Sequence, residues 1–141
     1  MISAIPKANA MLVCDYVITE QGTKKKSLIG IFENIGANNF PFIHASLSVY
    51  IKLTEARGQY RFRLELVNLK TDKVIGQGEI PHGVDIPNPL MSHELVFNLR
   101  GIQFRDPGEY EFRIFANDRI FGQKTFYVTA MPRKAKPENP Q

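Results

Sequence analysis

The sequence predicts an all-β protein, an antiparallel β-sandwich of about eight strands with immunoglobulin-like features. Apolar residues recur at every second position along most of the chain, and turn residues separate the alternating segments. The composition agrees, because ten Phe and five Tyr in 141 residues favour strands. The pattern does not determine strand order, so a C2-like sandwich and a jelly roll stay open as alternatives.

The first half of the chain holds four expected strands, at 11–20, 27–35, 45–55 and 59–69. A polar turn around Gly22 joins the first two, and Arg57-Gly58 joins the last two. The strand 27–35 is nearly continuous in apolar residues, whereas the next two alternate. Their expected inward residues are Leu47, Val49, Ile51, Leu53, Tyr60, Phe62, Leu64 and Leu66.

The second half holds four more expected strands, at 73–80, 94–104, 110–116 and 121–129. Asn117-Asp118 is a hairpin turn, because both residue types tolerate positive φ. Residues 81–92 form a long irregular segment whose three prolines exclude a central strand. The expected inward residues are Leu95, Phe97, Leu99, Tyr110, Phe112 and Ile114. Two such faces must cover each other, which makes a sandwich.

We expect one domain over residues 11–130, preceded by a segment 1–10 and followed by a disordered, basic and Pro-rich tail, 131–141. The formal net charge is +4. It resides in the turn Lys24–Lys26 and in the tail, so the body is nearly neutral. This distribution weighs against nucleic acid as a partner.

The N-terminus has no basic region, and Pro6 and Lys7 interrupt its apolar residues, so it does not read as a secretion signal. No apolar run reaches the roughly 18 residues that a membrane helix needs. Cys14 is the one cysteine and has no partner for an internal disulfide. We therefore expect a cytoplasmic protein that does not span a membrane.

The most specific local pattern lies at Asp106, Gly108, Tyr110 and Phe112. It matches the tyrosine corner of immunoglobulin-like sandwiches, in which a Tyr hydroxyl bonds to the backbone upstream of its strand. The alternative interpretation is that Asp106 and Tyr110 supply an acid and a hydroxyl group to a functional site. We favour the structural corner, because a buried Tyr hydroxyl needs a partner.

Several short motifs together carry a family resemblance: Cys14-Asp15-Tyr16, the segment Lys26–Phe32, Phe40-Pro41 and the Gly108-x-Tyr110-x-Phe112 end. They resemble a family of short bacterial proteins defined as a domain of unknown function (DUF6941-like), over most of residues 11–129. The resemblance implies a stand-alone domain. It carries over no activity and no site residue.

The candidate interaction loop is the segment that holds His82, Asp85, Ile86, Leu90, Met91 and His93. Long loops in compact domains are often functional. The polar members could bind a metal or act as acid and base, although solvated loop residues are the simpler interpretation. The apolar members either cap the core or contact a partner. No two of the three histidines stand at a metal-ligand spacing such as His-x-His, and no nucleotide-binding or hydrolase motif occurs, so we expect no cofactor.

Two further features have structural and functional interpretations. Cys14 could be a nucleophile, but Asp15 beside it raises a thiol pKa, so we expect a buried structural cysteine. Basic and aromatic residues on the outer face of the sheets could bind single-stranded nucleic acid. Acidic residues interleave with them, so we expect cross-strand ion pairs instead. The basic and aromatic residues are Arg61, Arg63, Arg100 and Arg113 with Tyr50 and Phe115, and the acidic residues are Glu65, Glu109 and Glu111.

These observations predict a non-enzymatic module that binds another protein or its own copies. The residues of the first strand and Ser46–Lys52 lack strong edge protection, which would allow strand addition if they lie at sheet edges. The alternative is a small-ligand or carbohydrate-binding module that uses the 81–93 loop. A metal-dependent hydrolase ranks behind both, and nucleic acid last.

Overall fold

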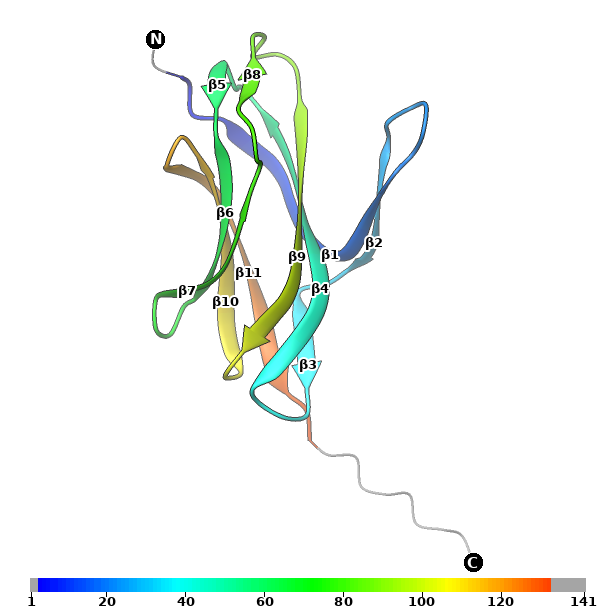
Figure 1. Ribbon diagram of the computed structural model, residues 1–141, viewed down its shortest axis with the longest axis vertical. Coiled ribbons are helices and arrows are strands. Elements are labelled where there is room, and N and C mark those ends of the chain that lie inside the picture. The colour runs from blue at the N-terminus through cyan, green and yellow to red at the C-terminus, as the bar shows by residue number, and fades with distance from the viewer. Residues whose placement is uncertain (1–2, 133–141) are drawn as a thin grey trace, which may run out of the picture.

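A computed structural model describes residues 3–132 and shows two β-sheets packed face to face (Figure 1). All regular elements within this range are strands. They are β1 (Lys7–Thr19), β2 (Lys26–Ile31), β3 (Asn34–Ala37), β4 (Phe42–Thr54), β5 (Gly58–Tyr60), β6 (Phe62–Asn68), β7 (Lys73–Glu79), β8 (Val84–Ile86), β9 (His93–Phe104), β10 (Gly108–Ala116) and β11 (Arg119–Ala130).

The strand order is that of an immunoglobulin-like sandwich. One sheet runs β2-β1-β4-β9 and the other β3-β11-β10-β6-β7, while β5 and β8 form a separate pair. Strands β1, β4 and β9 take the places of immunoglobulin strands A, B and E. Strands β6, β10 and β11 take those of C, F and G, with β7 added beside β6 as in variable-type domains. This order separates the fold from the C2-like and jelly-roll alternatives.

The core lies between the sheets, as the alternation predicts. Every expected inward residue of the four alternating strands is less than 9% exposed. At one end of the core, four aromatic rings pack together, and the Phe104 and Tyr110 centroids lie 4.9 Å apart. The other two rings are Phe112 and Phe126, 5.2 Å apart. The predicted all-β sandwich is therefore confirmed.

Residues 3–132 form eleven strands where the sequence predicted about eight. The expected strand 27–35 is two strands, because the chain leaves β1 after Ile31 and pairs from Asn34 with β11, in parallel. The expected strand 59–69 is interrupted at Arg61. Within the segment 81–92, Val84–Ile86 forms β8, because its prolines flank these residues and do not interrupt them.

The first strand begins four residues before the predicted start of the domain at residue 11. Strand β1 begins at Lys7, because Lys7 and Ala8 pair with Thr54 and Leu53 of β4. Upstream, the Ala4 amide donates a hydrogen bond to the Arg57 carbonyl. The predicted disordered tail falls outside the described residues from 133 onward.

One of the two expected sheet edges is wrong. The segment Ser46–Lys52 belongs to β4, which lies between β1 and β9. Residues 7–12 of β1, in contrast, have register partners in β4 alone, and those beyond Cys14 have partners in β2 alone. The edge strands of the described sheets are β2 and β9 in the first and β3 and β7 in the second. The two strands beside β4 therefore exclude strand addition along Ser46–Lys52.

Candidate functional site

A β-hairpin leaves the sandwich at the end of β1 and returns through β2 (Figure 1). Cys14 of β1 has register partners on both sides, Ser48 of β4 and Ile31 of β2. Beyond it, β1 pairs with β2 alone. Positive φ at Gly22 and Lys24 closes the turn at the tip. We call residues 15–31 the arm.

One face of the arm is apolar and faces solvent. Cross-strand pairing places Tyr16 opposite Ile29, and the two-residue period adds Ile18 and Ile31 to the same face. Tyr16 is 53% exposed and Ile31 54%, with Ile18 at 47% and Ile29 at 37%. Contiguous exposed apolar side chains of this kind mark interaction surfaces in soluble proteins.

Strand β2 also offers an open backbone edge. Strand β1 covers one side of it, and no strand of the described chain covers the other. Proteins usually protect such edges with proline, bulges or charges. Residues 26–31 contain no proline and one charged residue, Lys26, with a single irregularity at Gly30, where φ is +70°. The edge is therefore suited to strand addition.

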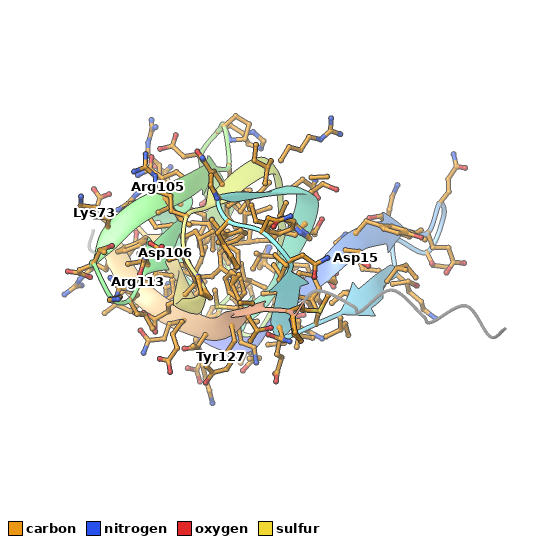
Figure 2. The ribbon with its side chains drawn as sticks, turned by 90° about the horizontal axis from the view of Figure 1, so that it is seen from below. Asp15, Lys73, Arg105, Asp106, Arg113 and Tyr127 are labelled. Carbon is orange, nitrogen blue, oxygen red and sulfur yellow. The ribbon has the colours of Figure 1, made fainter. Side chains whose placement is uncertain are left out.

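Opposite charges lie at the two ends of the arm. The tip carries Lys24, Lys25 and Lys26. At the root, the Asp15 side chain lies over Gly30, where a Cβ atom would collide with its carboxylate. Figure 2 shows Asp15 at this junction of arm and body. Within the described residues Asp15 has no ion-pair partner.

A pocket of about 310 Å³ lies at the root of the arm. Asp15, Gly30 and Phe32 line it together with Asn34 and His44. The His44 ring lies 6.1 Å from that of Phe32, and its buried Nε2 has no hydrogen-bond partner among the described residues. The lining of the pocket thus includes a carboxylate, an imidazole ring and a phenyl ring.

The structure divides the candidate interaction loop into buried and exposed parts. Ile86 is fully buried in β8 and caps the core, whereas Leu90 is 89% and Met91 50% exposed. His82 and Asp85 are exposed. His93 begins β9 opposite Leu53, and its buried Nε2 has no hydrogen-bond partner in residues 3–132.

These polar loop residues do not gather into a cluster of three potential metal ligands. In the described part of the chain, no group of three or more His, Cys, Asp or Glu side chains could hold a metal ion. Nor does any helix there have the length and apolar character needed to cross a membrane.

The residues of the predicted corner have the geometry that a tyrosine corner requires. The Tyr110 hydroxyl donates a hydrogen bond of 2.6 Å to the Asp106 carbonyl, and Gly108 adopts a φ of +148°. Burial raises the pKa of Tyr110. Cys14 is fully buried, and its burial and the nearby Asp15 carboxylate raise the pKa of its thiol. A raised pKa makes a thiol unreactive.

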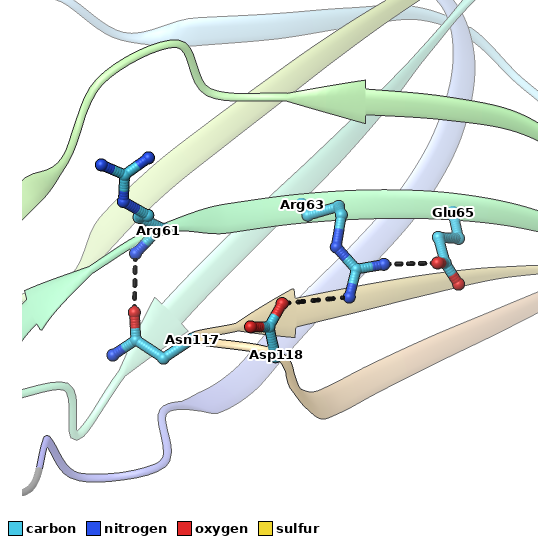
Figure 3. A network of polar contacts seen from close by, with 5 residues as sticks. All are labelled: Arg61, Arg63, Glu65, Asn117 and Asp118. Atoms are coloured by element: carbon cyan, nitrogen blue, oxygen red, sulfur yellow. Dashed lines mark hydrogen bonds and ion pairs between the residues drawn. The ribbon is translucent and has the colours of Figure 1, made fainter.

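Ion pairs neutralise much of the basic face of the second sheet (Figure 3). Arg63 contacts Glu65 and Asp118, and its guanidinium lies 4.1 Å from the Phe115 ring centroid. Arg113 pairs in the same way with Glu111, at 2.8 Å.

The expected cross-strand pairs are corrected in one respect. Both Arg–Glu pairs join residues two positions apart on one strand, because alternation places i and i+2 on the same face. Arg61 uses its backbone instead, since its amide donates to the Asn117 side chain. Arg100 and Glu109 form no ion pair within the described residues.

Sequence reasoning missed a groove of about 500 Å³ at one end of the sandwich. Lys73 and Arg105 line it, and neither has an ion-pair partner in the described chain. Figure 2 shows both on the opposite side of the body from Asp15. Apolar Val74 and Ile75 and the acidic residue Asp106 also line the groove, which therefore presents charges of both signs beside apolar surface.

Comparison with known proteins supports the fold. A model of a family of unknown function (DUF6941) matches residues 9–129. No curated protein sequence matches the chain. Among solved structures, the alkylpurine DNA glycosylase AlkC of Pseudomonas fluorescens, bound to DNA containing an abasic site analog, is 10% identical with a TM-score of 0.56.

The alignment covers 90% of this chain and 31% of the glycosylase, so the chain spans about a third of that protein. An immunoglobulin-like protein from Pseudomonas aeruginosa is 12% identical with a TM-score of 0.42, over 89% of this chain and 98% of that one. At 10% identity, the likeness to the glycosylase shows the fold alone.

Proposed function

Because the chain belongs to the family of unknown function DUF6941, its function has to be argued from its own surface, and we propose that it is a non-enzymatic protein-interaction module whose binding surface is the arm. One observation carries the proposal. Four large apolar side chains, exposed by 37–54%, line one face of a hairpin with an open edge strand.

The energetics of association support this surface. Full burial of one Ile side chain stabilises a complex by about 1.5–3 kcal/mol, and the arm offers three half-exposed isoleucines and a tyrosine. Strand addition along β2 would supply backbone hydrogen bonds, while the apolar face would select the partner. The arginine face is a weaker candidate, because internal ion pairs occupy Arg63 and Arg113.

A cytoplasmic location is part of the same proposal. Cys14 is buried and reduced, and no disulfide stabilises the described chain. Such a domain suits a reducing compartment.

A pair of matched variants tests the arm. The double change Ile29→Asp and Ile31→Asp places charge on the apolar face, while Val74→Asp and Ile120→Asp change two side chains of 45% exposure elsewhere. The amount of protein captured from the native cytosol by the tagged chain is measured. We expect the arm variant to capture at least tenfold less protein than the wild type, and the control variant to capture the same amount as the wild type.

Equal capture by both double variants would refute the arm as the binding surface. The extract is treated with nuclease before capture. If capture by the wild-type chain disappears after that treatment, nucleic acid and not protein is the partner.

A further inference from the structure

We propose that the partner of the arm is a second copy of this chain, added antiparallel along β2, with Leu28 on the two-fold axis and Lys26 of each copy against Asp15 of the other. This inference rests on the proposed function. It follows from the order of side chains along β2 and from the position of Asp15 over Gly30.

The register follows from the alternation of side chains. A two-fold axis perpendicular to the sheet keeps the same face of both copies upward, so facing residues must both be even or both be odd. With Leu28 on the axis, Lys26 faces Gly30 of the second copy. On the opposite face, Ser27 then lies across from Ile29 of the second copy, and on the axis Leu28 meets Leu28 of the second copy, which is an apolar contact across the junction.

The charges of β2 are self-complementary in this register. Lys26 precedes Leu28 by two residues, and Gly30 follows it by two. Gly30 has no side chain of its own, and the Asp15 carboxylate occupies the space beside it. The two-fold operation therefore brings Lys26 of one copy to Asp15 of the other, at both ends of the new ladder. Neither residue has an ion-pair partner within residues 3–132.

The position of the arm leaves room for the second copy. The arm projects from one side of the body (Figure 1). In the antiparallel arrangement, the root of each arm lies beside the tip of the other, so the two bodies lie at opposite ends of the paired arms. The result joins two four-stranded sheets through their β2 edges and covers the open edge of both.

Complementary charge reversal tests this arrangement. Asp15→Lys places two lysines at each contact of a homodimer, and Lys26→Asp places two carboxylates there. When the two variants are mixed, both contacts again join opposite charges. The measurement is molar mass by light scattering over a range of concentrations, with circular dichroism to verify folding. Lys73→Asp, which makes the same charge change outside the arm, is the control.

We expect the wild type and Lys73→Asp to dimerise equally. Each arm variant alone should dimerise at least tenfold more weakly, and an equimolar mixture of the two should recover the dimer. A wild type that stays monomeric at all concentrations would overturn the inference, as would a dimer that both variants retain. Loss in each variant without recovery in the mixture would also overturn it.

The capture experiment keeps this inference separate from the proposed function. If the wild type is monomeric but the variant Ile29→Asp with Ile31→Asp loses capture, the arm binds a different protein and only the second copy is refuted. If that variant also captures normally, both proposals fail.

Discussion

At the residue scale, Tyr50 shows how a side chain on the outer face of a sheet becomes buried. It points away from the core, yet it is only 8% exposed, between Leu12 and Val96 of the neighbouring strands. Its hydroxyl donates a hydrogen bond to the Glu94 carboxylate. Burial, followed by the hydrogen bond and the charge of Glu94, raises the pKa of Tyr50 to about 12.

This pKa makes the stability of the protein depend on alkaline pH. An unfolded Tyr ionises near pH 10, whereas folded Tyr50 stays neutral to about pH 12. The contribution of Tyr50 is therefore complete below pH 10 and is lost as the pH rises to 12. We expect the free energy of unfolding to fall by about 2 kcal/mol across this window, measured by urea denaturation.

The variant Tyr50→Phe should flatten this dependence but not abolish it, because the pKa of Tyr110 is raised as well. Tyr16→Phe changes an exposed tyrosine and is the matched control. If the free energy of unfolding of Tyr50→Phe falls with pH as steeply as that of the wild type, another group is responsible for the pH dependence.

At the element scale, the arm depends on the contact between Asp15 and Gly30. Gly30 combines a φ of +70° with a Cβ position that the Asp15 carboxylate fills. Left-handed backbone costs a residue other than glycine about 1–2 kcal/mol. Gly101 in β9 has a φ of +62° and nothing within 4 Å of its Cβ position, so it experiences the backbone strain alone.

We therefore predict that Gly30→Ala destabilises the arm by more than Gly101→Ala destabilises its own strand. Native-state hydrogen exchange of the amides in each strand measures these local free energies. Combining Gly30→Ala with Asp15→Ala should cost less than the sum of the two changes, because the collision disappears and the strain remains. Strict additivity would show that the two side chains do not share this space.

The sequence predicts the body of the sandwich better than the arm. Alternation identified inward residues such as Leu47, Phe62 and Phe112, because a side-chain period of two is a local property. It did not identify the break after Ile31, because β3 pairs with Tyr127 and its neighbours, more than ninety residues away. The exposure of the apolar face of the arm was likewise not predictable, because it depends on whether a segment distant in the sequence packs against that face.

The same limit applies to the candidate sites. The length and the apolar residues of the loop 81–93 predict an interaction surface, but in the structure Ile86 is buried, whereas Leu90 and Met91 are exposed. The groove at Lys73 and Arg105 joins segments thirty residues apart in the sequence, and neither segment has a recognisable motif. The tyrosine corner was predictable because its hydrogen bond spans only four residues, from Tyr110 back to Asp106.

At the scale of the whole molecule, the chain divides into a body that holds the core and an arm that does not. Among the described residues, the core cluster draws no member from 17–28. Tyr16 and Ile29 face each other across the two strands. A two-residue Asn-Gly turn that replaces Val17–Leu28 can therefore connect Tyr16 to Ile29 as a tight hairpin.

We predict that this shortened chain folds as stably as the wild type but no longer dimerises. Its free energy of unfolding in urea should change by less than about 0.5 kcal/mol, because the body keeps every core contact. Its molar mass in solution should be that of one chain at concentrations where the wild type forms dimers, because Lys26 and Leu28 are gone. A loss of cooperative unfolding would instead show that the arm stabilises the sandwich, and that its exposed isoleucines serve folding and not association.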